Sequence, residues 1–182
     1  MYDAIFKIVI FGDPGCGKTT LTRRFMTNLF VSDARMTIGV DFETKILEVD
    51  GTLVKLMMWD FAGDERFRFM IPQYINGAMG GILMYDITNY ASFAHISNWY
   101  SLIKETNNRF PIILLGGKLD LDDYREIDFQ EGLQAARTMD LFDCIECSSK
   151  TGENIVESFT MLTRLMLDKM IFEKKIPQSI IT

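Results

Sequence analysis

The octapeptide Gly12-Asp13-Pro14-Gly15-Cys16-Gly17-Lys18-Thr19 decides the fold class of this chain. It follows the apolar stretch 5–11 and precedes a helical pattern over 21–29, which is the strand–loop–helix context of a phosphate-binding loop. Its glycines let backbone N–H groups turn toward phosphate oxygens, and the helix N-terminus adds its positive dipole end. We therefore predict a nucleotide triphosphate site here, rather than a glycine-rich turn without a ligand.

Two side chains of this loop are suited to phosphate and metal chemistry. Lys18 can neutralise the outer phosphates, and the Thr19 hydroxyl can bind Mg²⁺. The loop alone does not distinguish ATP from GTP, or a kinase from a switch protein. The residues expected to contact the nucleotide in this segment are Asp13, Pro14, Gly15, Cys16, Gly17, Lys18, Thr19 and Thr20.

The composition indicates one globular domain. The chain has 182 residues and a net charge of -6, and 48% of its residues are hydrophobic. An acidic chain is a poor partner for nucleic acids and anionic membrane surfaces. We find no apolar run of bilayer-spanning length and no signal-peptide pattern at residues 1–7. Cys144 and Cys147 lack a second Cys or His pair, so we expect buried thiols in a reducing cytoplasm rather than a zinc site.

Strand and helix patterns alternate along the chain and predict an α/β fold. The expected strands cover 5–11, 41–49, 53–59, 80–85, 111–116 and 142–147, and the expected helices cover 21–29, 91–107, 129–139 and 153–170. The turn signal Asp50-Gly51 joins one antiparallel pair. We predict a six-stranded, mostly parallel sheet with one antiparallel edge pair and helices on both faces. Ligands bind such sheets at the carboxyl ends of the strands.

Three further segments carry a family resemblance. They are Met-Thr-Ile-Gly-Val-Asp-Phe at 36–42, Trp-Asp-Phe-Ala-Gly-Asp-Glu-Arg-Phe at 59–67 and Met-Tyr-Asp-Ile-Thr at 84–88. With the phosphate loop, they resemble the small GTPases of the Ras superfamily, and 37–42 resembles the Rab branch. The resemblance covers residues 4–170 and implies a P-loop NTPase G-domain over 1–175, with a tail over 176–182. It also implies GTP/GDP and Mg²⁺ as cofactors, and a part in vesicle trafficking.

The resemblance assigns roles to the two switch segments. Thr19, Thr37 and Asp60 would hold Mg²⁺, and the Gly63 N–H would contact the γ-phosphate. Both loops would be ordered only while the third phosphate is present. Taken singly, Thr37 is typical of an exposed loop hydroxyl and Asp60 of a helix cap. The group implied to act in hydrolysis is Lys18, Thr37, Gly63 and Asp64.

The base pocket follows the apolar strand 111–116. The tetrapeptide 117–120 resembles the family's Asn-Lys-x-Asp motif, in which Asp120 would accept two hydrogen bonds from guanine. The aliphatic stem of Lys118 would cover the base. The alternative for Lys118 and Asp120 is an ion pair on the surface without a ligand. The other implied nucleotide contacts are Phe30, Leu121, Ser148, Ser149 and Lys150.

Three positions depart from the family pattern. Gly117 stands where the family has asparagine, which removes a brace between the base pocket and the phosphate loop. Asp64 stands in place of the switch glutamine, so we expect slow hydrolysis because an ionised carboxylate only accepts hydrogen bonds. Pro14 lacks one N–H donor. One alternative function is a nucleotide-binding module without useful hydrolysis. The other is a phosphoryl-transfer kinase, which Asp120 disfavours because it indicates a guanine-binding switch protein.

Partner proteins would bind through the switch segments. We expect effectors, exchange factors and activators to contact residues 34–42 and 59–74. Phe42, Trp59 and Tyr74 match an aromatic triad of Rab-like proteins, although three core aromatics are the alternative. His95, the only histidine, is expected to be a helix-surface or packing residue.

The last residues set the expected location. Rab-like proteins usually end in lipid-bearing cysteines, and no cysteine follows position 147. We expect no direct membrane anchor in this chain, and a cytoplasmic protein that reaches membranes peripherally through partners or a further tail. This feature, with the 117–120 and 59–63 patterns, resembles Rab-like GTPases of Asgard archaea.

Overall fold

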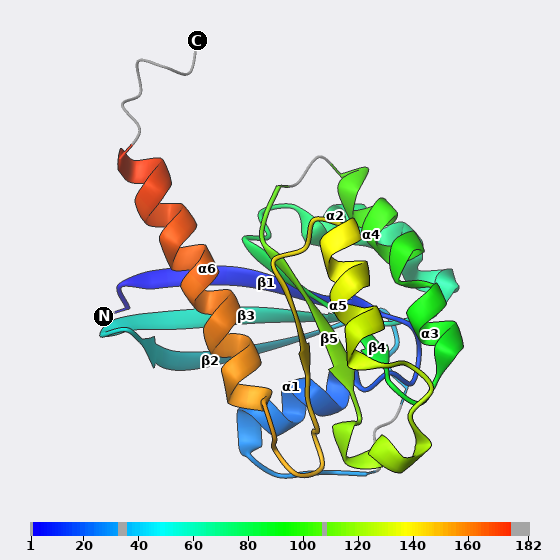
Figure 1. Ribbon diagram of the computed structural model, residues 1–182. Coiled ribbons are helices and arrows are strands. Elements are labelled where there is room, and N and C mark those ends of the chain that lie inside the picture. The colour runs from blue at the N-terminus through cyan, green and yellow to red at the C-terminus, as the bar shows by residue number, and fades with distance from the viewer. Residues whose placement is uncertain (1, 33–35, 107–108, 176–182) are drawn as a thin grey trace.

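The computed structural model describes residues 2–32, 36–106 and 109–175 (Figure 1). Its elements alternate between strands and helices, as the sequence predicts. In chain order they are β1 (Ala4–Gly12), α1 (Lys18–Thr27), β2 (Val40–Val49), β3 (Thr52–Phe61), η1 (Glu65–Met70), α2 (Ile71–Ile75), β4 (Gly80–Asp86), α3 (Tyr90–Ala94), α4 (Ile96–Lys104), β5 (Ile112–Gly117), η2 (Leu119–Tyr124), α5 (Phe129–Thr138), β6 (Asp143–Glu146) and α6 (Ile155–Lys175).

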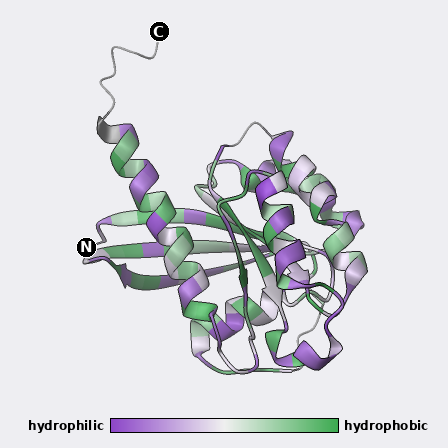
Figure 2. Ribbon diagram, viewed as in Figure 1, coloured by the Kyte–Doolittle hydropathy of each residue, from purple (hydrophilic) through white to green (hydrophobic). Residues whose placement is uncertain are grey.

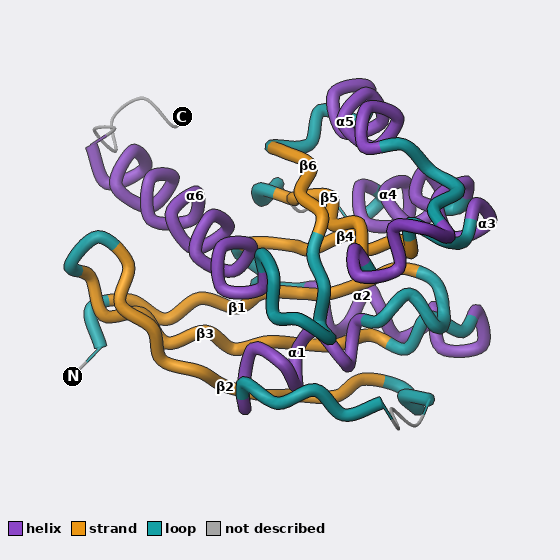
Figure 3. The backbone as a smooth tube through the Cα atoms, turned by 60° about the horizontal axis from the view of Figure 1, so that its bottom comes forward, coloured by secondary structure: helices purple, strands orange, loops and turns teal. Residues whose placement is uncertain are grey.

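The six strands form one twisted sheet in the order β2-β3-β1-β4-β5-β6 (Figure 3). Only the β2–β3 pair is antiparallel, and the β1–β3, β1–β4, β4–β5 and β5–β6 pairs are parallel. The predicted fold class is therefore confirmed. Because β3 and β4 flank β1 on opposite sides, the strand order reverses next to β1. In open α/β sheets, ligands bind at the carboxyl ends of the strands at such a point.

Apolar side chains bury both faces of the sheet. On one face, Leu21 and Phe25 of α1 and Phe159 of α6 pack against alternate residues of the strands, and the Phe25 and Phe159 rings stack 3.8 Å apart. On the other face, α2, α4 and α5 cover a second cluster that includes Phe11 and Trp99. Strands β4 and β5 are buried along their whole length and mostly hydrophobic (Figure 2), which is typical of parallel strands covered on both sides.

The structure corrects several element boundaries. The helix expected over 91–107 consists of two helices, α3 and α4, which meet at His95, and position 107 lies outside the described residues. Asn89 fixes the start of α3 because its side chain accepts hydrogen bonds from the N–H groups of Ala91 and Ser92. The short helices η1, α2 and η2 were not expected, because segments of five or six residues are too short for a helical period to emerge.

The closing helix is longer than its sequence pattern predicts. Helix α6 extends to Lys175, whereas the apolar spacing indicates an end near residue 170, and the expected tail at 176–182 lies outside the described residues. Among the residues that the structure describes, no helix is both long and apolar enough to cross a bilayer. Cys144 and Cys147 are buried, and burial raises the pKa of each thiol to about 12.

Candidate functional site

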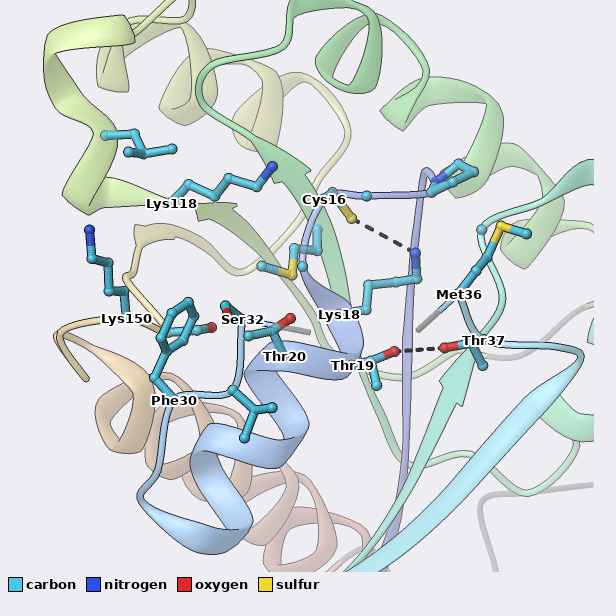
Figure 4. A pocket seen from close by; sticks show the side chains of 18 of the residues that line it. Cys16, Lys18, Thr19, Thr20, Phe30, Ser32, Met36, Thr37, Lys118 and Lys150 are labelled. Carbon is cyan, nitrogen blue, oxygen red and sulfur yellow. Dashed lines mark hydrogen bonds between the residues drawn. The ribbon is translucent and has the colours of Figure 1, made fainter. Parts of the chain in front are cut away.

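A cavity of about 520 Å³ lies at the carboxyl ends of β1, β4 and β5, where the sequence places the site (Figure 4). It has the size of a small-ligand pocket. Most of the predicted binding residues line it, and so do four residues that were not predicted as nucleotide contacts: Val31, Ser32, Met36 and Met84. Four predicted site residues do not line it: Asp13, Asp60, Asp64 and Ser148.

The phosphate loop is shaped by close approach of its backbone to β4. Gly12 pairs with Met84 across the β1–β4 ladder and adopts φ 143°, and a β-carbon at this position would lie 2.1 Å from the Met84 carbonyl oxygen. Only glycine fits there. The Lys18 ammonium is buried inside the loop and donates to the carbonyl oxygens of Gly12 and Asp13, at 2.8 and 2.7 Å. The loop therefore presents a fixed positive charge at the start of α1.

The three predicted metal-binding side chains converge on one point. Thr19 Oγ1 lies 2.7 Å from Thr37 Oγ1 (Figure 4) and also donates a short hydrogen bond to Asp60 Oδ2. The second carboxylate oxygen, Asp60 Oδ1, is buried with no hydrogen-bond partner among the described residues. Burial raises the pKa of Asp60 to about 6. Two hydroxyls and an orphaned carboxylate oxygen form an oxygen-only donor set, which suits Mg²⁺.

The other end of the cavity is built from the β5 and β6 loops. Ser148 is fully buried, and its hydroxyl donates to Asp120 Oδ1 at 2.6 Å, so Ser148 orients the carboxylate and does not line the cavity itself. Lys150 Nζ lies 3.7 Å from Asp120 Oδ2. Lys118 adopts φ 68° and its ammonium contacts Asp86 Oδ2 at 2.5 Å, which fixes its stem along the cavity wall.

The switch aspartate does not point into the cavity. Asp64 caps η1 by accepting from the Arg66 N–H and forms an ion pair with the Arg66 guanidinium at 2.7 Å. These hydrogen bonds lower the pKa of Asp64 to about 2. The resemblance implies a part for Asp64 in hydrolysis, whereas here its partially exposed carboxylate is neutralised by Arg66. A β-carbon at the adjacent Gly63 would lie 2.3 Å from the Pro14 nitrogen, so this turn of the chain lies directly on the phosphate loop.

The Asp13 carboxylate is anchored outside the cavity. It accepts a 2.8 Å hydrogen bond from Trp99 Nε1, and one of its oxygens lies 2.6 Å from His95 Nδ1. Asp13 therefore contributes its backbone to the phosphate loop while its side chain ties the loop to α3 and α4. His95, expected on a helix surface or in packing, is exposed and makes this contact with Asp13.

The three predicted triad aromatics form a continuous row. The Phe42 and Trp59 rings lie 4.8 Å apart, and the Trp59 and Tyr74 rings 5.4 Å apart. Phe42 is exposed, and Trp59 and Tyr74 are half-buried. A completely buried Trp59 would have argued for core aromatics alone. The row instead lies between core and surface.

Comparison with known proteins decides the family. A model of the Ras family matches residues 7–168, which is most of the chain. The chain belongs to the Ras family. It is 40% identical to Ras-related protein Rab-4A of Bos taurus and of Homo sapiens over 170 residues, which cover 93% of this chain and 78% of each relative. It is 39% identical to Ras-related protein Rab-8B of Bos taurus, of which it covers 82%.

Membership of this family gives the chain its general function. This Ras-family chain is a Rab-like small GTPase, a GTP-binding switch rather than a kinase. The predicted recognition of the Rab-like branch is confirmed, and the resemblance to archaeal proteins stays a prediction.

Proposed function

We propose that the cavity holds one guanine nucleotide, with its phosphates on loop 12–19 and its base against Asp120. The single observation that carries this proposal is the arrangement of the cavity: the buried Lys18 ammonium is at one end, and the Asp120 carboxylate, fixed by Ser148, is at the other. A cation pairs with phosphate, and an oriented carboxylate accepts from the guanine N1 and N2 groups that adenine does not present in that form. Phe30 and Leu121 line the base end, and Ser149 and Lys150 complete it.

Thr19, Thr37 and Asp60 would hold Mg²⁺ beside the outer phosphates. A bound Mg²⁺ neutralises charge on the β- and γ-phosphates during transfer. The chain's own contribution is the preformed contact between Thr19, Thr37 and Asp60, which links the phosphate loop, the segment before β2 and the end of β3. Thr37 and Gly63 would then contact the third phosphate, since both line the cavity beside the phosphate loop.

Hydrolysis is proposed to be slow because of Asp64. A glutamine at this position can donate to the phosphate and accept from water, whereas an ionised carboxylate can only accept. Asp64 is further removed from this task by its ion pair with Arg66. The Asp64→Gln variant is expected to hydrolyse GTP at least about tenfold faster in single turnover, since positioned acid–base and water-orienting groups contribute about 10²-fold or more.

The experiment also tests the second candidate function, a binding module without useful hydrolysis. Release of phosphate from one bound GTP is measured for the parent, for Asp64→Gln and for Asp64→Asn, which removes the charge but keeps the short side chain. Rapid release by the parent would contradict the slow-hydrolysis proposal. If all three proteins are inert with and without candidate activator proteins, the binding-module function is the better account.

We also propose that partner proteins bind across the two switch segments. Large apolar side chains are exposed in both, including Met36, Ile38 and Phe69, and the same two segments carry the aromatic row of Phe42, Trp59 and Tyr74. Exposed apolar clusters of this kind mark protein interaction surfaces. The predicted surface also includes residues 34 and 35, which lie outside the described residues. A cytoplasmic location with peripheral membrane attachment through such partners belongs to the same proposal.

A further inference from the structure

The side chain of Met84 lies between the two loops that would hold the nucleotide. Met84 is almost completely buried, yet it lines the cavity. Its terminal methyl, Cε, faces the phosphate loop on one side, because a β-carbon built on Gly17 would lie 3.4 Å from it. The same methyl faces the base loop on the other side, because a β-carbon built on Gly117 would lie only 2.5 Å from it.

The volume beside Gly117 is therefore already filled. A side chain at 117 would meet Met84 Cε at 2.5 Å and the Cys16 carbonyl oxygen at 3.0 Å. The carbonyl belongs to the phosphate loop and cannot yield without moving that loop, so the methyl would have to move. Met84 is packed in the core on its other sides, and the cavity is the open direction left for the displaced methyl.

We infer that Met84 is a positioning residue for nucleotide binding, which braces the phosphate loop against the base loop in place of a side chain at 117. The flexible thioether is suited to filling an irregular gap between two backbone segments. Because both segments present glycine to it, one buried methyl fixes their separation. Methionine at 84 and glycine at 117 thus form one unit: each residue suits the site only while the other is present.

This inference rests on the proposed guanine-nucleotide pocket, and a double-mutant cycle tests it. The variants are Met84→Val, Gly117→Asn and the double variant, and the measured quantity is the release rate of fluorescently labelled GDP in Mg²⁺. Met84→Val is expected to release GDP about tenfold faster, since it opens a gap between the loops. Gly117→Asn is expected to release it no more slowly than the parent. The double variant should come within about threefold of the parent, because contacting residues couple strongly.

Controls separate this role from simple loss of stability. Met166→Val makes the same truncation in a buried methionine of α6 that does not line the cavity, and it should lower the melting temperature without changing GDP release. Should Met84→Val fail to fold, Met84→Leu takes its place in the cycle, because leucine keeps most of the volume but not the terminal methyl.

The outcomes are distinct. The proposed guanine pocket requires that the parent binds labelled GDP, and that excess GTP displaces this GDP whereas excess ATP does not. If either condition fails, the proposed pocket itself is wrong. If the parent binds and the two substitutions simply multiply their effects on release, Met84 is an ordinary core residue and the inference is overturned. A Gly117→Asn variant that alone slows release would overturn it as well, since the site would then have room for the asparagine.

Discussion

Asp60 is a buried carboxyl group in the site whose charge lacks full compensation. It lies at the end of β3, 2% exposed, and one of its oxygens has no hydrogen-bond partner among the described residues. Burial is the main cause of its raised pKa, and the hydrogen bond from Thr19 opposes that cause only in part. A buried carboxylate in this position can bind a cation, and its ionised form is destabilised when no cation is bound.

The metal-free protein should therefore lose stability as Asp60 ionises. The pKa rises from 3.8 to about 6 on folding, so the folded state binds the proton more tightly than the unfolded state does. The stabilising contribution of the Asp60 carboxyl to the free energy of unfolding is largest below pH 4, where the group is protonated. It falls between about pH 4 and 6 and is lost above pH 6. We expect Asp60→Asn to stabilise the metal-free protein by roughly 2 kcal/mol at pH 7.5.

Denaturant unfolding in a chelator at pH 4 and pH 7.5 checks this expectation. The difference between Asp60→Asn and the parent should shrink toward zero at pH 4, where the parent carboxyl is protonated. Excess Mg²⁺ with GDP should reverse the order at pH 7.5. A variant less stable than the parent in chelator at pH 7.5 would contradict the burial penalty.

At the residue scale, the sequence located the chemical groups but not their partners. Lys18, Thr19 and Asp120 could be predicted because their motifs are short and local. The contacts of Asp13 with His95 and Trp99 span 82 and 86 positions, and nothing in the local pattern indicates them. The Arg66 partner of Asp64 is close in sequence, but the ion pair depends on η1, which begins at Glu65 and is capped by Asp64, bringing the two side chains together.

At the scale of elements, the base loop depends on an ion pair behind it. Arg125 follows η2 and forms two hydrogen bonds with Glu146 of β6, at 2.6 and 2.8 Å, and both side chains are largely buried. The pair holds η2, which carries Asp120, onto the edge strand. Such bidentate, charge-assisted pairs are stronger and more directional than neutral hydrogen bonds.

Glu146→Gln should therefore loosen the base loop as well as the fold. We expect it to lower the free energy of unfolding by roughly 1–3 kcal/mol, because it leaves the Arg125 charge without its buried partner. GDP release should become faster. The matched control is Asp122→Asn, which removes an exposed partner of the same arginine and should change stability by less than about 0.5 kcal/mol. Equal losses in both variants, by thermal melting, would contradict this role.

Sequence patterns predicted the long helices and the strands, but not the short helices. The strands and the long helices have enough apolar positions to fix their type, whereas η1, α2 and η2 are set by caps and tertiary contacts. The break at His95 illustrates this limit: apolar residues continue on both sides of it, and the turn between α3 and α4 appears only in the backbone. These short elements nevertheless carry the candidate switch and base loops.

At the scale of the whole molecule, the cavity joins segments from most of the chain. Its lining runs from Pro14 to Lys150 and draws on segments after β1, α1, β3, β5 and β6, together with Met84 of β4. A ligand bound there contacts only the folded arrangement, because the unfolded chain cannot bring these segments together. Nucleotide binding and global stability are therefore linked by mass action.

GDP with Mg²⁺ should consequently stabilise the entire domain. At a free concentration one hundred times the dissociation constant, we expect the free energy of unfolding to rise by about 2.7 kcal/mol. For a domain of this size, that corresponds to an increase in melting temperature of roughly 5–10 °C. ADP at the same concentration should give no comparable increase, since its base cannot donate to Asp120 as guanine does.

The Asp120→Asn variant is the matched control. In this variant the stabilisation by GDP should shrink, whereas the melting temperature without nucleotide should change little, because the Asp120 side chain contacts only Ser148 and Lys150 among the described residues. Equal stabilisation by ADP and GDP would show that the phosphates alone determine binding, and would leave the base end of the cavity without its proposed role.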